Sequence, residues 1–188
     1  MKGKTVKQFV VAVRVLLVFT VVLGIAYPLA MTGLAQVLFP GNANGSIVKV
    51  DGKEVASDLI GQQYDGPQWF HTRPSAAKYD GKASAASQYG PNNADLLKLV
   101  NERREQIAKL EGVDPAQVPP DAVTASGSGL DPAISPAYAA LQVDRVARER
   151  GLSVADVQKL VQANTHGRVL GFLGEPYVNV VTLNAALA

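Results

Sequence analysis

The sequence predicts an α+β protein with a single N-terminal transmembrane helix followed by one extracytoplasmic mixed α/β domain. Three observations lead to this class. One long apolar segment lies near the N-terminus, basic residues precede it without any acidic one, and capped helical periodicities then alternate with short β-rich segments. We therefore divide the chain into a cytoplasmic basic leader (1–14), a transmembrane helix (15–38) and an extracytoplasmic domain (39–188).

The apolar segment reads VLLVFTVVLGIAYPLAMTGLAQV from Val15 to Val37, 23 residues without a formal charge. As a helix rising about 1.5 Å per residue it would reach roughly 35 Å, enough to cross a hydrocarbon core of about 30 Å. Four basic residues precede it: Lys2, Lys4, Lys7 and Arg14. Because basic flanks stay preferentially on the cytoplasmic side, they predict a cytoplasmic N-terminus with the bulk of the chain outside.

A cleaved secretory signal is the alternative for this segment. The small residues of Gly33-Leu34-Ala35 would suit a cleavage site. The apolar region of a signal usually spans about 7–15 residues. This segment is longer and continues to Pro40-Gly41, where a helix would stop. The pattern therefore favours a retained anchor in the membrane lipid.

Small residues recur within the apolar segment and suggest a face that packs on another membrane helix. The candidates are Gly24, Ala26, Pro28, Ala30, Gly33 and Ala35. The alternative for Gly24 and Pro28 is a tolerated kink, since both residue types are common in membrane helices. A helix without a partner would have no use for such a face, so the pattern favours a partner.

Charge and composition argue against a nucleic-acid-binding protein and against one built on disulfides or thiolate metal sites. The net charge is +2, but four positive charges lie in the first 14 residues, which leaves −2 on the remainder. The basic character is therefore a property of the leader, and no nucleic-acid partner is expected. The chain has no cysteine, so disulfides and thiolate metal sites are excluded.

The first part of the external domain reads as a linker, a hairpin and a long irregular stretch. Residues 42–46 are polar and lead away from the membrane. Segments 47–50 and 53–55 predict two strands around an Asp51-Gly52 turn. Residues 61–93 are rich in Gly, Pro, Ser and Asn, and so long a stretch without periodicity is usually functional or mobile.

The rest of the domain predicts three helices and one strand. Asn93 is an N-cap for a helix to Glu111, which Gly112 ends. A second helix opens at Ser135-Pro136 and ends at Gly151, and a third runs from Ser153 to about Asn164. The β-rich segment from Tyr177 to Leu183 predicts a final strand.

Motifs for catalysis or metal binding are absent from the sequence. His71 and His166 have no second histidine or acid at ligand spacing, so we expect structural roles and no metal. The Ser126-Gly127-Ser128-Gly129 run lacks the flanking glycines that a nucleophile elbow has. No phosphate-binding G-x-x-x-x-G-K-[ST] loop and no Asp-Lys-Thr-Gly-Thr phosphorylation motif occurs. A self-sufficient enzyme, such as a secreted serine hydrolase, is therefore poorly supported.

Three strings resemble a known family. They are WFHTRPSA from Trp69, VTASGSGLDPAISP from Val123 and LGFLGEPYVNV from Leu170. Together with Tyr27-Pro28-Leu29 in the apolar segment, they are similar over nearly the whole chain to the KdpC family. The resemblance gives these candidate subunit-contact or family-motif residues: Trp69, Phe70, His71, Arg73, Pro74, Ser126, Ser128, Asp131, Glu175 and Asn179.

The resemblance implies a non-catalytic subunit of the KdpFABC potassium pump in the bacterial plasma membrane. A KdpA-like channel subunit, a KdpB-like ATPase subunit and a KdpF-like small subunit would be its partners. ATP and potassium would be handled by the complex, with no cofactor bound by this chain. The family is also described as a catalytic chaperone that raises the ATP affinity of the pump subunit. With most of the chain outside, only residues 1–14 could meet cytoplasmic nucleotide, which favours an indirect route through the membrane helix.

The chain departs from the family pattern at two places. Ser84 to Pro91 reads SAASQYGP where the family usually has Ser-Gly-Gly-Ser-Asn-Leu-Gly-Pro, a loop offered as a nucleotide contact. Alanines in place of glycines make a close backbone approach less available. Ala133 stands where the family often has histidine.

Each string also has a structural alternative. Trp69 to His71 would contact another subunit or form a local core, and a core is the commoner role of such a cluster. The string from Val123 would offer oxygen ligands to a cation or form a turn leading to the cap at Ser135. A membrane-tethered binding module for a cation or small ligand thus remains the alternative function.

Overall fold

The computed structural model describes residues 2–188, with side chains from Val6 onward. The side chains of Lys2 and Lys4 therefore lie outside the described residues. The chain forms two compact units, Met1–Ser46 and Ile47–Ala188. The mixture of helices and strands confirms the α+β class.

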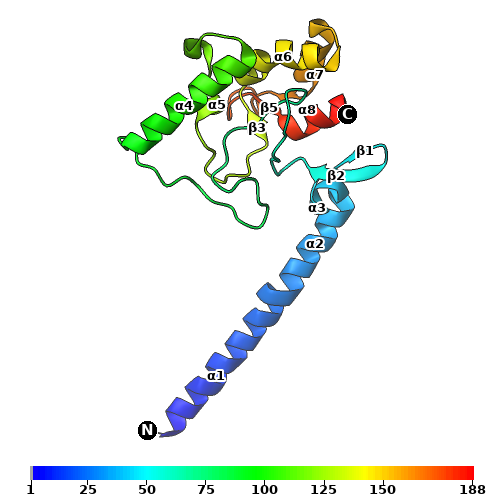
Figure 1. Cartoon of the computed structure of the whole chain (residues 1–188). Helices are drawn as coiled ribbons and strands as arrows, with labels where there is room; N and C mark the ends of the chain where they lie inside the picture. The colour runs from blue at the N-terminus through cyan, green and yellow to red at the C-terminus, as the bar shows by residue number, and fades with distance from the viewer. Residues whose placement is uncertain (1) are drawn as a thin grey trace. The chain divides into compact units, whose positions relative to one another are not determined.

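The N-terminal unit is one nearly continuous helix, drawn in blue in Figure 1. It comprises α1 (Lys2–Val21), a π-helical turn η1 (Val22–Ala26) and α2 (Tyr27–Leu38), and a short α3 (Pro40–Ala43) follows. Residues Val6–Leu38 have a mean hydropathy of 2.7, and none of the most apolar window is buried. Among the described residues this is the one helix long and apolar enough to cross a membrane, as the sequence predicts.

The π turn explains how the helix accommodates its proline. The amide of Tyr27 donates to the carbonyl of Val22, five residues earlier. Proline has no amide hydrogen and its ring crowds the carbonyl four residues before it, which for Pro28 is that of Gly24. A wider turn directly before Pro28 absorbs this conflict while the helix continues to Leu38.

The second unit begins with the expected hairpin. Strands β1 (Ile47–Val50) and β2 (Lys53–Ser57) pair antiparallel, and Val50 faces Lys53. Asp51 and Gly52 have φ values of 51° and 76°. Positive φ at both central residues is the geometry that an Asp-Gly turn favours. The prediction is confirmed, with β2 two residues longer than expected.

The predicted helices are present with the predicted caps. They are α4 (Ala94–Glu111), α6 (Pro136–Arg150) and α7 (Val154–Ala163). Asn93, Ser135 and Ser153 each accept backbone amides at the N-termini. The Pro-rich link adds two short pieces, η2 (Pro115–Gln117) and α5 (Pro120–Val123).

The C-terminus corrects one prediction. Instead of a strand from Tyr177 to Leu183, the structure has β5 (Tyr177–Asn179) followed by α8 (Val180–Leu187). The Asn179 side chain accepts the amides of Val181 and Thr182 at 2.9 and 3.2 Å and so caps α8. Tertiary packing overrides the β propensity of the valines, because one helical side buries Val180, Leu183 and Leu187.

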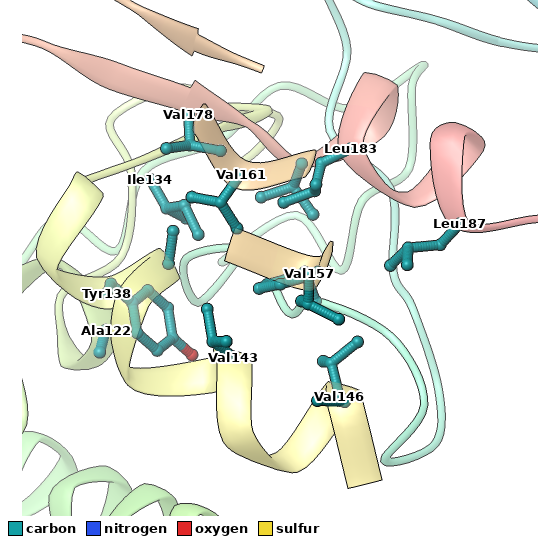
Figure 2. Close-up of a cluster of buried hydrophobic side chains, with 14 of the residues drawn as sticks. Ala122, Ile134, Tyr138, Val143, Val146, Val157, Val161, Val178, Leu183 and Leu187 are labelled. Carbon is teal, nitrogen blue, oxygen red and sulfur yellow. The ribbon is translucent and has the colours of Figure 1, made fainter. Parts of the chain in front are cut away.

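Short strands and helices enclose one core. β5 lies between β3 (Ala133–Ile134) and β4 (Thr165–His166), antiparallel to both. Figure 2 shows side chains from β3, β5, α6, α7 and α8 converging between these elements. The labelled members are Ala122, Ile134, Tyr138, Val143, Val146, Val157, Val161, Val178, Leu183 and Leu187.

Candidate functional site

The loop of residues 67–73, which carries the first family string, is held to the core by side-chain amides. Asn184 of α8 accepts the amide of Phe70 and donates to its carbonyl, both at 2.9 Å. Gln142 of α6 does the same for His71, at 2.7 and 3.1 Å. Each amide side chain thereby satisfies the backbone N–H and C=O of one loop residue, as a neighbouring strand would do in a sheet. The phenyl ring of Phe70 is fully buried in the core.

Arg145 of α6 is the centre of this arrangement. Its Nε donates to both carboxylate oxygens of Glu111 at 3.0 Å, and both side chains are about 1% exposed. Its Nη1 donates to the carbonyls of Pro67 and Trp69, and its Nη2 donates to Gln142. The guanidinium thus joins α4, α6 and the loop through donors on all three of its nitrogens.

Burial sets the electrostatics of this network. Desolvation raises the pKa of Glu111, and the attraction of Arg145 opposes this rise. Arg150 lies five residues after Arg145 on α6. Its guanidinium stacks 4.0 Å from the centre of the Trp69 ring. It also donates to the carbonyls of Gln68 and Leu187. Two arginines therefore hold the loop from one helix.

His71 is held by hydrogen bonds within the domain. Its Nε2 lies 3.0 Å from the carbonyl of Gly66, and since a carbonyl only accepts, Nε2 carries the proton. Burial lowers the pKa of His71, and the bond to Gly66 opposes that effect. The ring is therefore held in its neutral form near pH 7.

Arg73 connects the first string to the second. Its Nη1 lies 3.3 Å from Oδ2 of Asp131, whose Oδ1 accepts the amide of Ala133 at 2.9 Å. The carbonyl of Pro74 accepts the amide of Ser126 at 3.3 Å. The hydroxyl oxygens of Ser126 and Ser128 accept the amides two or three residues later in their own turn. This is the geometry of an ordered turn leading to the helix cap at Ser135.

A polar cleft of about 470 Å³ lies beside these residues. Arg73 and Tyr79 line one part of it, and Arg103 of α4 lines another. Arg103 also donates to the carbonyl of Val123 at 3.0 Å. The cleft thus combines hydrogen-bond donors from the irregular stretch and from α4.

The third string forms a hairpin. His166 of β4 pairs with Tyr177 of β5, and their rings stack 4.8 Å apart. Glu175 is exposed and accepts from Arg168 across the hairpin at 2.7 Å. Asn179 is buried and caps α8, as described above, and its Nδ2 donates to the carbonyl of Asp58 at 2.7 Å.

The two glycines of the long apolar helix have room for a side chain. A Cβ added at Gly33 would have no neighbour within 4 Å. At about 100° per residue, Ala26, Ala30 and Gly33 share one side of the helix, whereas Gly24 and Ala35 fall near the opposite side. The small residues therefore divide between two sides.

The described residues contain no cluster of three or more His, Asp or Glu that could hold a metal ion. Ten candidate residues were expected at subunit contacts or in family motifs. Phe70, Ser126 and Asn179 are buried, whereas Ser128 and Glu175 are exposed, and the other five candidates are half-buried. The first two strings meet through Arg73 and Asp131. The third meets the second where β5 pairs with β3, with Asn179 opposite Ala133.

Comparison with known proteins identifies the family. Residues 9–188 match the sequence profile described as KdpC, the c chain of the K+-transporting ATPase. The chain belongs to the KdpC family. A Potassium-transporting ATPase KdpC subunit of Kineococcus radiotolerans is 56% identical over 174 residues, covering 92% of this chain and 88% of the relative. Another, of Sorangium cellulosum, is 52% identical over 179 residues, covering 94% of each. The resemblance drawn from the three strings is therefore confirmed, and the chain is an accessory subunit of this ATPase.

Within this KdpC chain, the altered loop from Ser84 packs against the second string. The amide of Ala85 and the hydroxyl of Ser84 both donate to the carbonyl of Ser128 at 3.0 Å. Gly129 has a φ of 68°, and a Cβ there would lie 2.7 Å from the carbonyl oxygen of Ala85. The backbone of Ala85 therefore makes contacts within the domain.

Sequence reasoning missed the residues that hold the first string. Glu111, Gln142, Arg145, Arg150 and Asn184 lie on helices whose polar positions read as solvent-facing. One signal was available for Asn184, since it lies between Leu183 and Leu187 on a helix with little polar content. No pattern in the sequence joined Arg145 to Glu111, which lies 34 residues earlier.

Proposed function

We propose that this chain is a non-catalytic subunit that stabilises the assembly of a potassium-transporting ATPase, anchored by one membrane helix. Its partners would be a KdpA-like channel subunit, a KdpB-like ATPase subunit and a KdpF-like small subunit. The observation that carries the proposal is that the chain combines an exposed apolar helix with a well-packed domain, and that the described residues contain no metal-binding cluster. An exposed apolar surface of that length needs lipid or other membrane helices to cover it.

The proposed topology places residues 1–14 in the cytoplasm, 15–38 in the bacterial plasma membrane and 39–188 outside. Lys7 and Arg14 support it, since both precede the most apolar part of the helix. The chain has no cysteine, so single cysteines can report sidedness without background. A membrane-impermeant maleimide added to intact cells should label Asp144→Cys and leave Lys7→Cys unlabelled. The reverse pattern would exclude this orientation.

Assembly itself is tested by purifying the tagged full-length chain in mild detergent from potassium-starved cells. We expect it to bring down a P-type ATPase and a potassium-channel-like subunit together. Recovery of the chain alone, from cells in which both other subunits are expressed, would contradict the proposal.

A finer proposal concerns nucleotide use. We propose that any effect on the ATP affinity of the pump passes through the membrane helix and not through direct contact with ATP. In this topology the folded domain lies outside the membrane, whereas ATP is in the cytoplasm. Deleting residues 2–7 while preserving insertion should then leave the ATP dependence of the pump unchanged. Loss of the nucleotide effect on that deletion would refute the indirect route.

The polar cleft supports a second candidate, a membrane-tethered binding module. Its volume of about 470 Å³ and its lining by Arg73, Arg103 and Tyr79 would suit a small polar ligand. This role predicts a ligand-dependent rise in the melting temperature of the solitary chain. An Arg103→Gln variant that melts like the parent and loses that rise would locate the ligand in the cleft.

A further inference from the structure

A pocket of about 430 Å³ lies beside the third string and contains an unsatisfied acceptor. Among the described residues, three buried side-chain atoms have no hydrogen-bond partner, and Oδ1 of Asp58 is the only acceptor of the three. Asp58 lines this pocket together with Asn164, His166 and Tyr177. A buried carboxylate oxygen without a donor is unfavourable, and a donor brought in from outside would relieve it.

The hairpin above this pocket carries an exposed apolar tip, which we define as Val169, Leu170, Phe172 and Leu173. Phe172 is 71% exposed and Leu170 is 78% exposed. The tip is held in shape, since Val169 and Leu173 exchange both backbone hydrogen bonds at 2.9 Å. Gly171 and Gly174, with φ values of 81° and 78°, supply the turn. A rigid apolar surface loses little conformational entropy when a partner covers it.

The apolar tip and the Asp58 pocket belong to one surface. His166 and Tyr177 form the base of the hairpin, and the same two residues line the pocket. Leu59 also lines the pocket and is exposed. Arg168 is paired with Glu175 across the hairpin, so its guanidinium is already engaged. The surface therefore offers an apolar projection with an unpaired acid at its base.

We propose that this surface docks another protein subunit, which covers the apolar tip with an apolar groove and inserts a lysine or arginine into the Asp58 pocket. The proposal rests on the assembly role above and specifies where one contact lies. Charge complementarity selects this kind of partner, because none of the side chains that line the pocket donates to Oδ1 of Asp58. A free cation would satisfy Asp58 but leave the apolar tip in water. A lipid bilayer would cover the tip but offer the acid no fixed donor.

The dissociation of the detergent-solubilised complex tests the charged contact. Asp58→Asn should shorten the half-life of this chain on the complex about thirtyfold or more, as loss of one partner of a desolvated charge pair does. Asp144→Asn, which removes an exposed carboxylate on α6, is the matched control and should match the parent. The melting temperature of the solitary full-length Asp58→Asn chain should match that of the parent, because Oδ1 of Asp58 has no donor there to lose. An unchanged half-life, or a fall in the melting temperature that accounts for the loss, would overturn the proposal.

The apolar contact is tested in the same assay. Phe172→Ser should accelerate dissociation about tenfold. Leu97→Ser on α4, where the side chain is 64% exposed, is the control and should have no effect. Equal dissociation of Phe172→Ser and the parent would overturn the apolar contact.

Photo-cross-linking then distinguishes a subunit from lipid. With p-benzoylphenylalanine in place of Phe172 in native membranes, we expect an adduct to another polypeptide, whereas the same group in place of Leu97 should give none. Adducts to lipid only, or no adduct at position 172, would overturn the docking surface. If the parent chain fails to co-purify with any pump subunit, the assembly role itself fails, which is a separate result from failure of the variants.

Discussion

Arg145 and Glu111 form an ion pair in the interior of the domain, in which both carboxylate oxygens lie 3.0 Å from Nε and share its single hydrogen. The pair joins α6 to the end of α4, and the remaining donors of Arg145 hold the loop that carries Trp69 and Phe70. A single side chain therefore connects the helical part of the domain to its first family string.

Arg145→Lys should destabilise the domain by about 3–5 kcal/mol, because it leaves a buried carboxylate poorly paired and several carbonyls without donors. Thermal unfolding of the full chain in detergent, followed by the fluorescence of Trp69, measures the change. Arg148→Lys replaces an exposed arginine on the same helix and should change little. A shift as small as that of the control would mean that Arg145 is not essential to the fold.

Asn184→Ala should cost about 1–3 kcal/mol for each of the two Phe70 backbone groups that it leaves unsatisfied. The free energy of unfolding in urea measures this cost. Asn101→Ala removes an exposed amide from α4 and serves as the control. If both variants unfold at the same urea concentration, water must satisfy the backbone of Phe70.

Gly61→Ala should destabilise by about 1–3 kcal/mol, since a Cβ there would lie 2.6 Å from the carbonyl oxygen of Asp131. Gly127→Ala is the matched control, because a Cβ there has no neighbour within 4 Å. Melting temperatures of the two variants measure the difference. Equal stability would show that the contact between Gly61 and the second string can open without cost.

The lowered pKa of His71 predicts a pH dependence of stability. In the unfolded chain the ring takes up a proton near its ordinary pKa of about 6.5, whereas the folded domain resists protonation. The unfolded state therefore binds more protons below that pH, so stability is fully present above about 6.5 and declines as the pH falls toward the lowered value. His71→Gln should flatten this decline in melting temperature between about pH 7 and 5. A decline of the same size in the variant would assign it to other groups.

The small side of α2 predicts a helix contact within the membrane. Ala30→Leu enlarges the side that Ala26, Ala30 and Gly33 share, and should weaken co-purification with the other pump subunits. Thr32→Leu, nearly opposite on the helix, is the control and should assemble like the parent. Weakening by Thr32→Leu alone would place the contact on the other side.

The sequence by itself determined the elements that local chemistry controls. The apolar segment, the Asp-Gly hairpin and the capped helices are confirmed, because a run of apolar residues, a positive-φ turn and an N-cap each act within a few residues. The family strings also identified the family, since they occur as continuous stretches.

Only the tertiary structure decided where the C-terminal segment turns from strand to helix and what the family strings do. Val180 and Val181 favour a strand, but the cap at Asn179 and burial of one helical side outweigh that preference. Several candidate residues contact partners that lie far away in the chain: Gln142 is 71 residues from His71, and Asn184 is 114 residues from Phe70. Contacts over such separations depend on how helices pack, which periodicity and local propensity do not encode.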